Sequence, residues 1–140
     1  MAVAVICEFN PFHNGHKYLI NRVKTLTNEP VIAIMSGSFT QRGEVAVASK
    51  FVRARAALQN GADLVAELPS VYAVACAERF ARAGVAIAAS FDCVSKLAFG
   101  CENDVLDELY RVIKAKQNPQ IAEIIKAKMK SGDYYPRAFE

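Results

Sequence analysis

The chain has two histidines, His13 and His16, and both stand in a polar segment that covers residues 8–16. An imidazole ring donates a hydrogen bond whether it is neutral or protonated, so two rings can hold one phosphate group. The segment follows an apolar run, contains Pro11 and Gly15, and precedes a run with helical periodicity. We therefore expect it at a helix N-terminus, where unpaired N–H groups and the helix dipole attract anions. If the α-phosphate of ATP lies there, the two rings would stabilise the charge that gathers on its oxygens in the transition state.

Two other interpretations of this histidine pair stay open. The pair could bind zinc, but protein metal sites bring three or four ligands, and the nearby candidates are Cys7 and Glu8. The two histidines could also be ordinary surface or helix-capping residues. The occurrence of a proline, a glycine and both histidines in one strand-to-helix turn favours the phosphate site.

Four short apolar runs predict strands, and helical periodicity between them predicts helices. The expected strands are 3–7, 30–35, 63–68 and 94–99. The expected helices are an amphipathic run with Tyr18, Leu19, Val23 and Leu26, a helix capped by Ser49 with Phe51, Ala54 and Leu58, an alanine-rich helix over 72–89, and two helices around 105–113 and 121–129. Alternating strands and helices predict an α/β fold, a three-layer sandwich around a mainly parallel sheet. Such sheets bind ligands beyond the carboxyl ends of their strands, where the strand order reverses, so loops 8–16, 36–50 and 100–103 are candidate sites.

The second of these loops, 36–50, is long for a connection between a strand and a helix. Its Arg42 and Lys50 are candidates for contact with a triphosphate or an RNA phosphate, because guanidinium and ammonium groups bind both. The alternative is a solvated loop with ordinary surface charge. Lys50, Arg53 and Arg55 could together form a basic face, although a charged stripe on an amphipathic helix is usually its solvated side.

The acidic residues near the expected site have no assigned catalytic role. Glu8 adjoins the phosphate loop, where a carboxylate would repel ATP, hold Mg²⁺ or accept an amide hydrogen bond, and its role is open. Asp63, Glu67 and Glu78 are expected to be structural.

Composition limits the class of protein. With 140 residues, 53% hydrophobic and 22% charged, the chain is expected to be one packed soluble domain, and the net charge of +3 modestly favours an anionic partner. No apolar run approaches the roughly 20 residues that cross a bilayer. The start of the chain lacks a basic leader, which predicts a cytoplasmic protein. The cysteines are expected to be reduced thiols, with Cys76, Cys93 and Cys101 as small buried residues.

The tetrad His13-Asn14-Gly15-His16 resembles the His-x-Gly-His signature of the nucleotidylyltransferase (HIGH) superfamily. The longer strings over residues 8–16, 35–44 and 57–65 are similar to those of the bacterial tRNA(Met) cytidine acetate ligases. This resemblance implies a Rossmann-like fold. It also implies an ATP-dependent enzyme that forms acetyl-AMP from acetate, releases pyrophosphate and acetylates the wobble cytidine of elongator tRNA(Met) to N4-acetylcytidine. The implied cofactor is ATP with Mg²⁺, and the implied partners are acetate and that tRNA, with no DNA and no membrane.

The same resemblance assigns site residues. The histidines His13 and His16 would be catalytic. The ATP-binding residues would be Ile6, Cys7, Glu8, Phe9, Asn10, Pro11, Phe12, His13, Asn14, Gly15, His16, Lys17, Tyr18, Leu19 and Gly100.

The implied organisation is a Rossmann-like ATP-binding domain over 1–100 with a helical extension of it over 101–140. Members of the resembled family continue well beyond the position of Glu140. The chain is therefore expected to be the N-terminal catalytic part of such a protein or a shortened relative, with weak ATP binding and an incomplete reaction when alone. The alternatives are a small-molecule adenylyltransferase and a nucleotide-binding fragment without catalysis.

Overall fold

The computed structural model describes residues 1–101 and 106–132. The chain divides into two compact units, Met1–Gly100 and Cys101–Glu140, and each is described by itself. Within the described ranges, no helix has both the length and the apolar character needed to cross a membrane.

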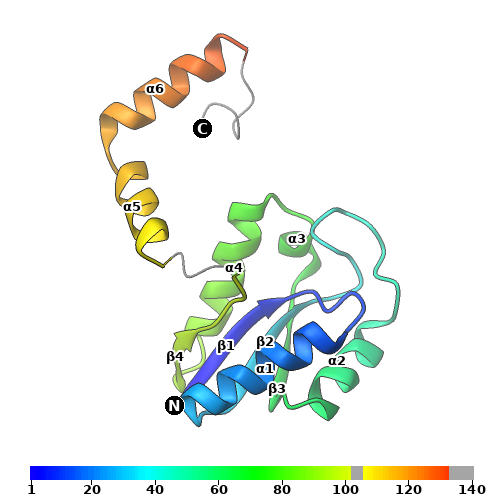
Figure 1. The fold of residues 1–140 in the computed structure, drawn as a ribbon. Helices are drawn as coiled ribbons and strands as arrows, with labels where there is room; N and C mark the ends of the chain where they lie inside the picture. The colour runs from blue at the N-terminus through cyan, green and yellow to red at the C-terminus, as the bar shows by residue number, and fades with distance from the viewer. Residues whose placement is uncertain (102–105, 133–140) are drawn as a thin grey trace. The chain divides into compact units, whose positions relative to one another are not determined.

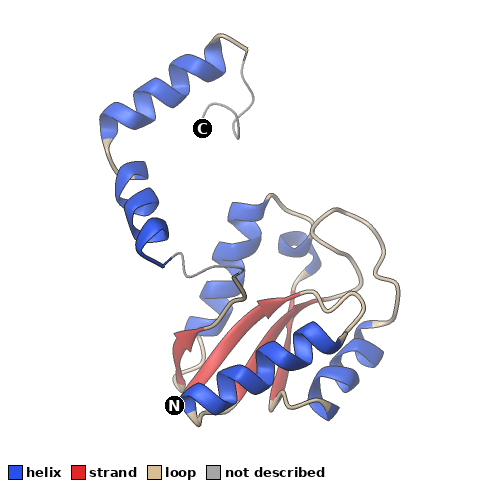
Figure 2. Cartoon of the chain, viewed as in Figure 1, coloured by secondary structure: helices blue, strands red, loops and turns tan. Residues whose placement is uncertain are grey.

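The first unit is built around a parallel sheet with the strand order β3-β2-β1-β4 (Figures 1 and 2). Its elements are β1 (Ala2–Cys7), α1 (Asn14–Thr27), β2 (Val31–Ser36), α2 (Lys50–Gln59), β3 (Leu64–Leu68), α3 (Ser70–Ala73), α4 (Ala77–Ala89) and β4 (Val94–Leu97). The chain moves outward from β1 to β3 and then returns to the other side of β1 for β4. The strand order therefore reverses at β1, and the predicted parallel α/β fold is confirmed.

Alternate residues of β1 supply the cores on the two faces of the sheet. Val3 and Val5 belong to a buried cluster with Ile20 and Val23 of α1 and Ala57 of α2. Ala2 and Ala4 belong to a second cluster with Ala73 of α3 and Ala88 of α4. Figure 1 shows α1 and α2 on one face of the sheet and α4 on the other. Because side chains alternate along a strand, one apolar strand supports three layers.

The alanine-rich segment differs from its prediction at its start. Instead of one helix over 72–89, the chain forms α3 and α4 with a break at residues 74–76. Cys76 is the N-cap of α4, and the carbonyl of the preceding Ala75 accepts a hydrogen bond from the Gln41 side chain at 3.3 Å. The loop that contains Gln41 thus contacts the chain at this break. Local periodicity cannot predict the break, because the contact comes from a distant part of the sequence.

Gly84 lies inside α4 at the point of closest approach to the sheet. A Cβ atom at this position would lie 2.7 Å from Cδ1 of Ile6 on β1. The lack of a side chain therefore lets the helix pack directly on the strand, which explains a glycine in the middle of a helix.

The buried face of α2 differs from the face that apolar spacing predicts, and that of α1 differs in part. In α1, Val23 is buried and Leu19 packs against the core as expected, whereas Tyr18 is 71% exposed and Ile20 is buried instead. In α2, Phe51 is 74% exposed but Arg53 only 2% exposed. Arg53 is therefore not part of a basic surface with Lys50 and Arg55. Packing against the sheet decides which face of α2 is buried. The polarity pattern of α2 predicts a face that is displaced by one residue from the buried one.

Two smaller expectations were also wrong. The fourth strand ends at Leu97 rather than at residue 99. Cys76, Cys93 and Cys101 are exposed rather than buried. The expected cap of the second helix is confirmed, since the Ser49 hydroxyl accepts a hydrogen bond from the Val52 amide at 3.3 Å.

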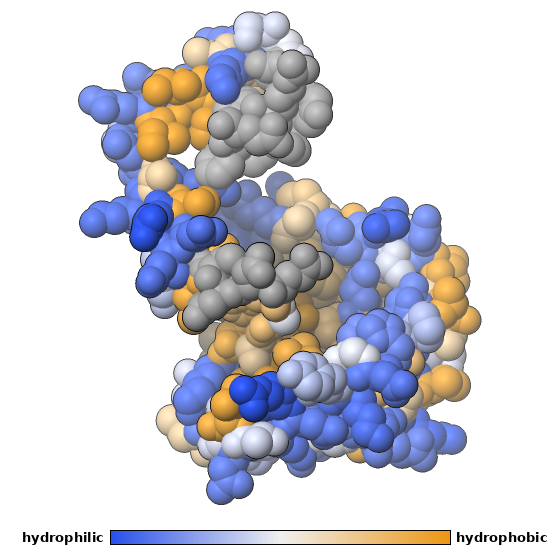
Figure 3. All heavy atoms as spheres, viewed as in Figure 1, coloured by the Kyte–Doolittle hydropathy of each residue, from blue (hydrophilic) through white to orange (hydrophobic). Residues whose placement is uncertain are grey.

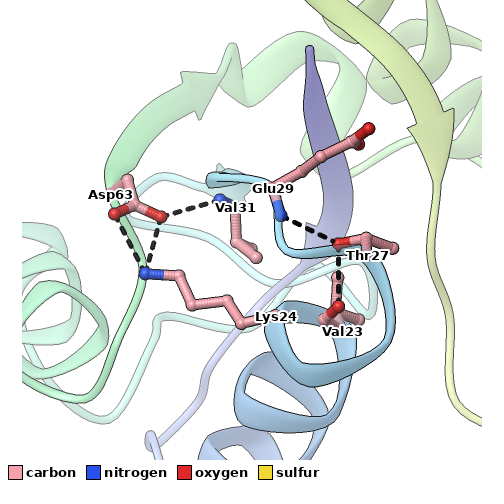
Figure 4. Close-up of polar contacts among 6 residues, drawn as sticks. All are labelled: Val23, Lys24, Thr27, Glu29, Val31 and Asp63. Atoms are coloured by element: carbon pink, nitrogen blue, oxygen red, sulfur yellow. Dashed lines mark hydrogen bonds and ion pairs between the residues drawn. The ribbon is translucent and has the colours of Figure 1, made fainter.

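Polar side chains tie together the amino ends of the strands (Figure 4). The Asp63 carboxylate accepts a hydrogen bond from the Val31 amide at 2.8 Å and forms an ion pair with the Lys24 ammonium, also at 2.8 Å. The Thr27 hydroxyl donates to the Val23 carbonyl and accepts from the Glu29 amide. Asp63 thus joins α1, the start of β2 and the start of β3, in the structural role expected for it.

The second unit contains α5 (Leu106–Lys116) and α6 (Pro119–Lys130), as the amphipathic pattern predicts. Asn118 caps α6 by accepting from the Gln120 amide at 3.0 Å, and Pro119 takes the first helical position. Neither helix contains a buried residue, and apolar side chains contribute to the surface of both units (Figure 3). Of the predicted loop 100–103, only residues 100 and 101 are described by the structure. Residues 102–103 and Val105 lie outside the described residues.

Candidate functional site

A cavity of about 500 Å³ lies at the carboxyl end of β1, where the strand order reverses. Residues from β1, from the loop that follows it, from α1 and from the loop after β2 line this cavity. They are Val5, Ile6, Cys7, Glu8, Phe9, Asn10, Pro11, His13, His16, Leu19, Thr40, Arg42 and Glu44. The cavity therefore occupies the position that parallel α/β sheets offer to ligands.

The two histidines hold each other in place at the start of α1. His13 is the N-cap, and its Nδ1 accepts a hydrogen bond from the Gly15 amide at 3.1 Å. Reciprocally, Nδ1 of His16 accepts from the His13 amide at 3.3 Å, which completes a capping box. The rings stack with their centroids 3.7 Å apart and their planes 25° apart. The interpretation of the histidines as capping residues is thus confirmed.

Capping does not exclude a role in ligand binding, because it uses only one nitrogen of each ring. A backbone amide can only donate, so both Nδ1 atoms act as acceptors and the proton of each neutral ring is on Nε2. Each ring therefore keeps an N–H donor that capping does not use, and both His13 and His16 line the cavity. The capping box fixes the tautomer that a pair of donors needs.

Gly15 leaves room for the His13 ring at the start of α1. A Cβ at Gly15 would lie 3.0 Å from Cε1 of the His13 ring. The group that comes close to Gly15 is therefore the capping ring, rather than another backbone segment. Any larger residue would push the His13 ring from its place.

The His16 ring packs against the aromatic rings of Phe9 and Phe12. The centroid of the His16 ring lies 4.8 Å from that of the Phe9 ring and 5.6 Å from that of the Phe12 ring. Burial lowers the pKa of His16 below its ordinary value of 6.5, and the charge of His13 lowers it further. His16 is therefore neutral at pH 7 and presents Nε2–H as a donor. Phe9 itself is 1% exposed and adopts a φ of 47°, a conformation that is costly for a bulky residue.

The loop after β2 folds against the histidine loop. The Gln41 amide donates to the Glu8 carboxylate at 2.6 Å, and the Val47 amide donates to the Asn10 side chain at 2.8 Å. The structure thus brings together two of the loops that the sequence selects. Of the roles left open for Glu8, the one seen is that of an amide acceptor.

Thr40 is a cavity residue that the sequence does not single out. Its side chain is buried, and its Oγ1 has no hydrogen-bond partner among the residues that the structure describes. A buried hydroxyl without a partner is costly, and a polar ligand in the cavity would satisfy it. The neighbouring Arg42 is exposed and adds a positive charge to the rim, opposed by Glu44.

Several residues expected to contact ATP or phosphate do not line the cavity. These are Phe12, Asn14, Gly15, Lys17, Tyr18, Gly100 and Lys50. The Lys50 ammonium forms an ion pair with Glu67 at 2.6 Å, beside a separate, smaller cavity. Gly100 is exposed at the end of the first unit, and a Cβ there would meet no atom within 4 Å.

Metal binding has little support in the described part of the chain. No group of three His, Cys, Asp or Glu side chains there could hold an ion. Burial raises the pKa of the Cys7 thiol far above its ordinary value, and Sγ lies 3.6 Å from the Ile34 carbonyl. Cys7 is therefore a protonated thiol in the ligand-free chain.

Comparisons with known proteins agree with this geometry. The sequence profile of the HIGH Nucleotidyl Transferase family matches residues 1–140. A tRNA(Met) cytidine acetate ligase of Bacillus velezensis is 43% identical over 140 residues, which cover 98% of this chain and 34% of that protein. The ligase of the same name from Pediococcus pentosaceus is 55% identical over 107 residues, 76% of this chain and 29% of that protein.

A solved structure is also similar. The crystal structure of Thermotoga maritima TmcAL bound with alpha-thio ATP superposes with a TM-score of 0.93 at 38% identity, over 99% of this chain and 34% of that one. The chain thus spans about a third of the length of these relatives. The profile match over the whole chain, the sequence identities and the shared fold show that this chain belongs to the HIGH nucleotidyltransferase family.

Proposed function

We propose that this chain forms the ATP-binding, adenylate-forming part of a tRNA(Met) cytidine acetate ligase. The observation that carries the proposal is the pair of stacked imidazoles, His13 and His16, whose capping bonds leave both Nε2–H donors to one cavity. The similarity to ligases of that name, and to a protein whose crystal structure was solved with alpha-thio ATP bound, supports the same proposal.

The residues of the cavity fit a triphosphate. The first turn of α1 contains no acidic residue, so the positive end of the helix dipole acts near the cavity without an opposing charge from that turn. Arg42 supplies a cation, and the unpartnered hydroxyl of Thr40 supplies a further polar group. Glu8 is engaged by the Gln41 amide, which reduces its repulsion of phosphate. Mg²⁺ that accompanies ATP would be held mainly by the phosphate oxygens.

In the proposed reaction, a carboxylate oxygen of acetate forms a bond to the α-phosphorus while the bond to pyrophosphate breaks. Acetate is already ionised, so no residue needs to act as a base. The rings of His13 and His16 donate through Nε2–H to the α-phosphate oxygens, where charge gathers in the transition state. One such preorganised donor contributes about 10²–10³ in rate at comparable sites.

The second proposed step transfers the acetyl group to RNA. The exocyclic amine of the wobble cytidine attacks the acetyl carbon, AMP leaves with the bonding electrons, and the amine loses a proton. Because the chain spans a third of its relatives, we assign only ATP binding and support of adenylate formation to the residues described. Contacts with elongator tRNA(Met) belong to the proposal for the whole ligase.

Calorimetric titration of the chain with ATP and Mg²⁺ tests the proposal directly. We expect binding with one site per chain, and pyrophosphate release that requires acetate. ATP binding without release of pyrophosphate would support the nucleotide-binding role of this chain and would mean that turnover requires the complete ligase. Release that requires a phosphorylated cofactor precursor and yields a dinucleotide would establish the small-molecule adenylyltransferase instead. No binding of ATP at millimolar concentration would contradict the proposal.

A further inference from the structure

Arg53, in the first half of α2, is 2% exposed, yet the acceptors that the structure gives for its side chain are all backbone carbonyls. Its Nε donates to the Ala48 carbonyl at 3.0 Å. Its Nη1 donates to the carbonyls of Glu8 at 2.5 Å and Ser36 at 3.2 Å, and its Nη2 donates to that of Gly37. One guanidinium thus connects the segments that follow β1 and β2 and the segment that precedes α2.

This use of a buried arginine differs from the common one. Buried cations are normally paired with a carboxylate, because desolvation is costly. Here the dipoles of four carbonyls replace the water around the cation. Burial lowers the pKa of Arg53, an effect that Cys7, Glu8 and Glu67 oppose, and the guanidinium keeps its proton at neutral pH.

The four acceptors connect Arg53 to both sides of the cavity, although it does not line the cavity itself. The Glu8 carbonyl immediately precedes Phe9, whose left-handed backbone places its ring against His16. The Glu8 side chain in turn holds the Gln41 amide, next to Thr40. A shift of the Glu8 backbone would therefore move the histidine side and the Thr40 side of the cavity together.

We infer that Arg53 is a positioning residue that holds the histidine loop and the loop after β2 in register and thereby sets the affinity of the cavity for its ligand. The part of this inference that concerns the ligand rests on the proposed function. The planar fork of a guanidinium reaches four carbonyls in different directions, whereas the ammonium of lysine offers three donors from one point. Charge alone therefore cannot replace Arg53.

The test compares Arg53→Lys with Arg55→Lys in the 140-residue chain. Arg55 lies two positions further along the same helix and is exposed, so it is a matched control. We expect Arg53→Lys to weaken ATP binding about tenfold, the equivalent of one charge-assisted hydrogen bond. We also expect the NMR titration of His16 in the ligand-free chain to move toward that of an ordinary histidine. The control should change neither property.

A second variant keeps the test decisive if the lysine variant is too unstable to measure. In Arg53→Ala, methylguanidinium should restore the His16 titration and the ATP affinity together, with a dose dependence that ammonium does not reproduce. ATP affinity within twofold of wild type in folded Arg53→Lys, with an unchanged His16 titration, would overturn the inference. So would recovery of affinity in Arg53→Ala by a stabilising osmolyte alone.

The two proposals fail in distinguishable ways. If the wild-type chain does not bind ATP, the proposed function fails. The effect of Arg53→Lys on the ligand-free His16 titration would still show whether Arg53 positions the histidine loop.

Discussion

The two ends of the parallel sheet use polar side chains differently. At the amino end, charges from separate elements meet in pairs, with Lys24 bound to Asp63 at 2.8 Å and Lys96 bound to Glu29 at 2.6 Å. At the carboxyl end of β1, His13 and His16 each accept one capping hydrogen bond at Nδ1, and both residues line the cavity. The ion pair at that end, between Lys50 and Glu67, stands apart from this cavity.

This difference indicates that the amino end of the sheet contributes to stability, whereas the carboxyl end of β1 contributes to the binding of a ligand. Polar groups at the amino end bond mainly to one another, although Oε2 of Glu29 has no hydrogen-bond partner among the described residues, so their removal should reduce stability without affecting a ligand. Around the cavity, each histidine is bonded at Nδ1 but not at Nε2, and the buried Thr40 hydroxyl has no partner, within the part of the chain that the structure describes. Such unbonded polar atoms reduce the stability of the fold unless a polar ligand binds them. Variants that separate these two properties therefore test the comparison.

The largest effect is expected at the cavity, from the double variant His13→Asn with His16→Gln. Asparagine is a strong N-cap and glutamine at the third helical position completes a capping box, so the caps remain while both imidazole donors are replaced by amide N–H groups of different reach and direction. We expect ATP affinity to fall about 100-fold or more, because each donor to a charged phosphate is worth about 1.5–3 kcal/mol. The free energy of unfolding should change by less than about 0.5 kcal/mol. Equal affinity in the double variant and wild type would remove the histidines from the site.

The next effect is expected at the amino end, from Asp63→Ala. The change leaves the Val31 amide and the Lys24 ammonium without their acceptor. Because the carboxylate is partly exposed, we expect a loss of about 1.5 kcal/mol in the free energy of unfolding, measured in urea. Lys24→Met is the control and should cost less than about 1 kcal/mol, since it removes only an exposed ion pair. A weakened ATP affinity in Asp63→Ala would show that the two ends are coupled.

A smaller effect is expected from Gly15→Ala, which should separate stability from binding within the site itself. The added methyl group would lie 3.0 Å from the His13 ring and displace it. Alanine also favours the helix by up to about 1 kcal/mol relative to glycine. We therefore expect stability to be maintained while ATP affinity falls about fivefold, a value below one full donor hydrogen bond. An unchanged affinity would mean that the position of the His13 ring does not matter.

The smallest effect is a difference in pH dependence between the two ends. The pKa of His16 is lowered by burial and by His13, so the unfolded chain binds the proton more tightly, and stability falls as the pH drops below 6.5 toward the lowered value. For Asp63, partial burial raises the pKa, but the hydrogen bonds and charge of Lys24 and the Val31 amide produce a net decrease below 3.8. Its contribution is present above that pH and is lost as the pH falls through the folded pKa.

Urea denaturation between pH 7.5 and pH 3 would resolve these two phases. His16→Gln should remove the phase that begins near pH 6.5, and Asp63→Asn should remove the acid phase. A stability profile of His16→Gln identical to that of wild type between pH 7 and pH 5 would contradict the assignment of the first phase.

The sequence predicts the site better than it predicts the packing. The positions of His13 and His16 between a strand and a helix follow from local patterns, and so does the parallel sheet. The burial of Arg53 does not, because polarity marks arginine as a solvent-facing residue. Thr40 is similarly hidden, since nothing in the local sequence shows that its hydroxyl lacks a partner.

By itself, the sequence of this chain determined the order of strands and helices, the place of the histidine loop and the family resemblance. These depend on residue type and spacing within a few positions, which the printed letters contain. Only the tertiary structure decided which face of α2 is buried, that Arg53 joins loops more than ten residues away, and that the Nδ1 atoms of His13 and His16 are occupied. Such features depend on which distant carbonyls and amides meet, and that is fixed when the layers pack.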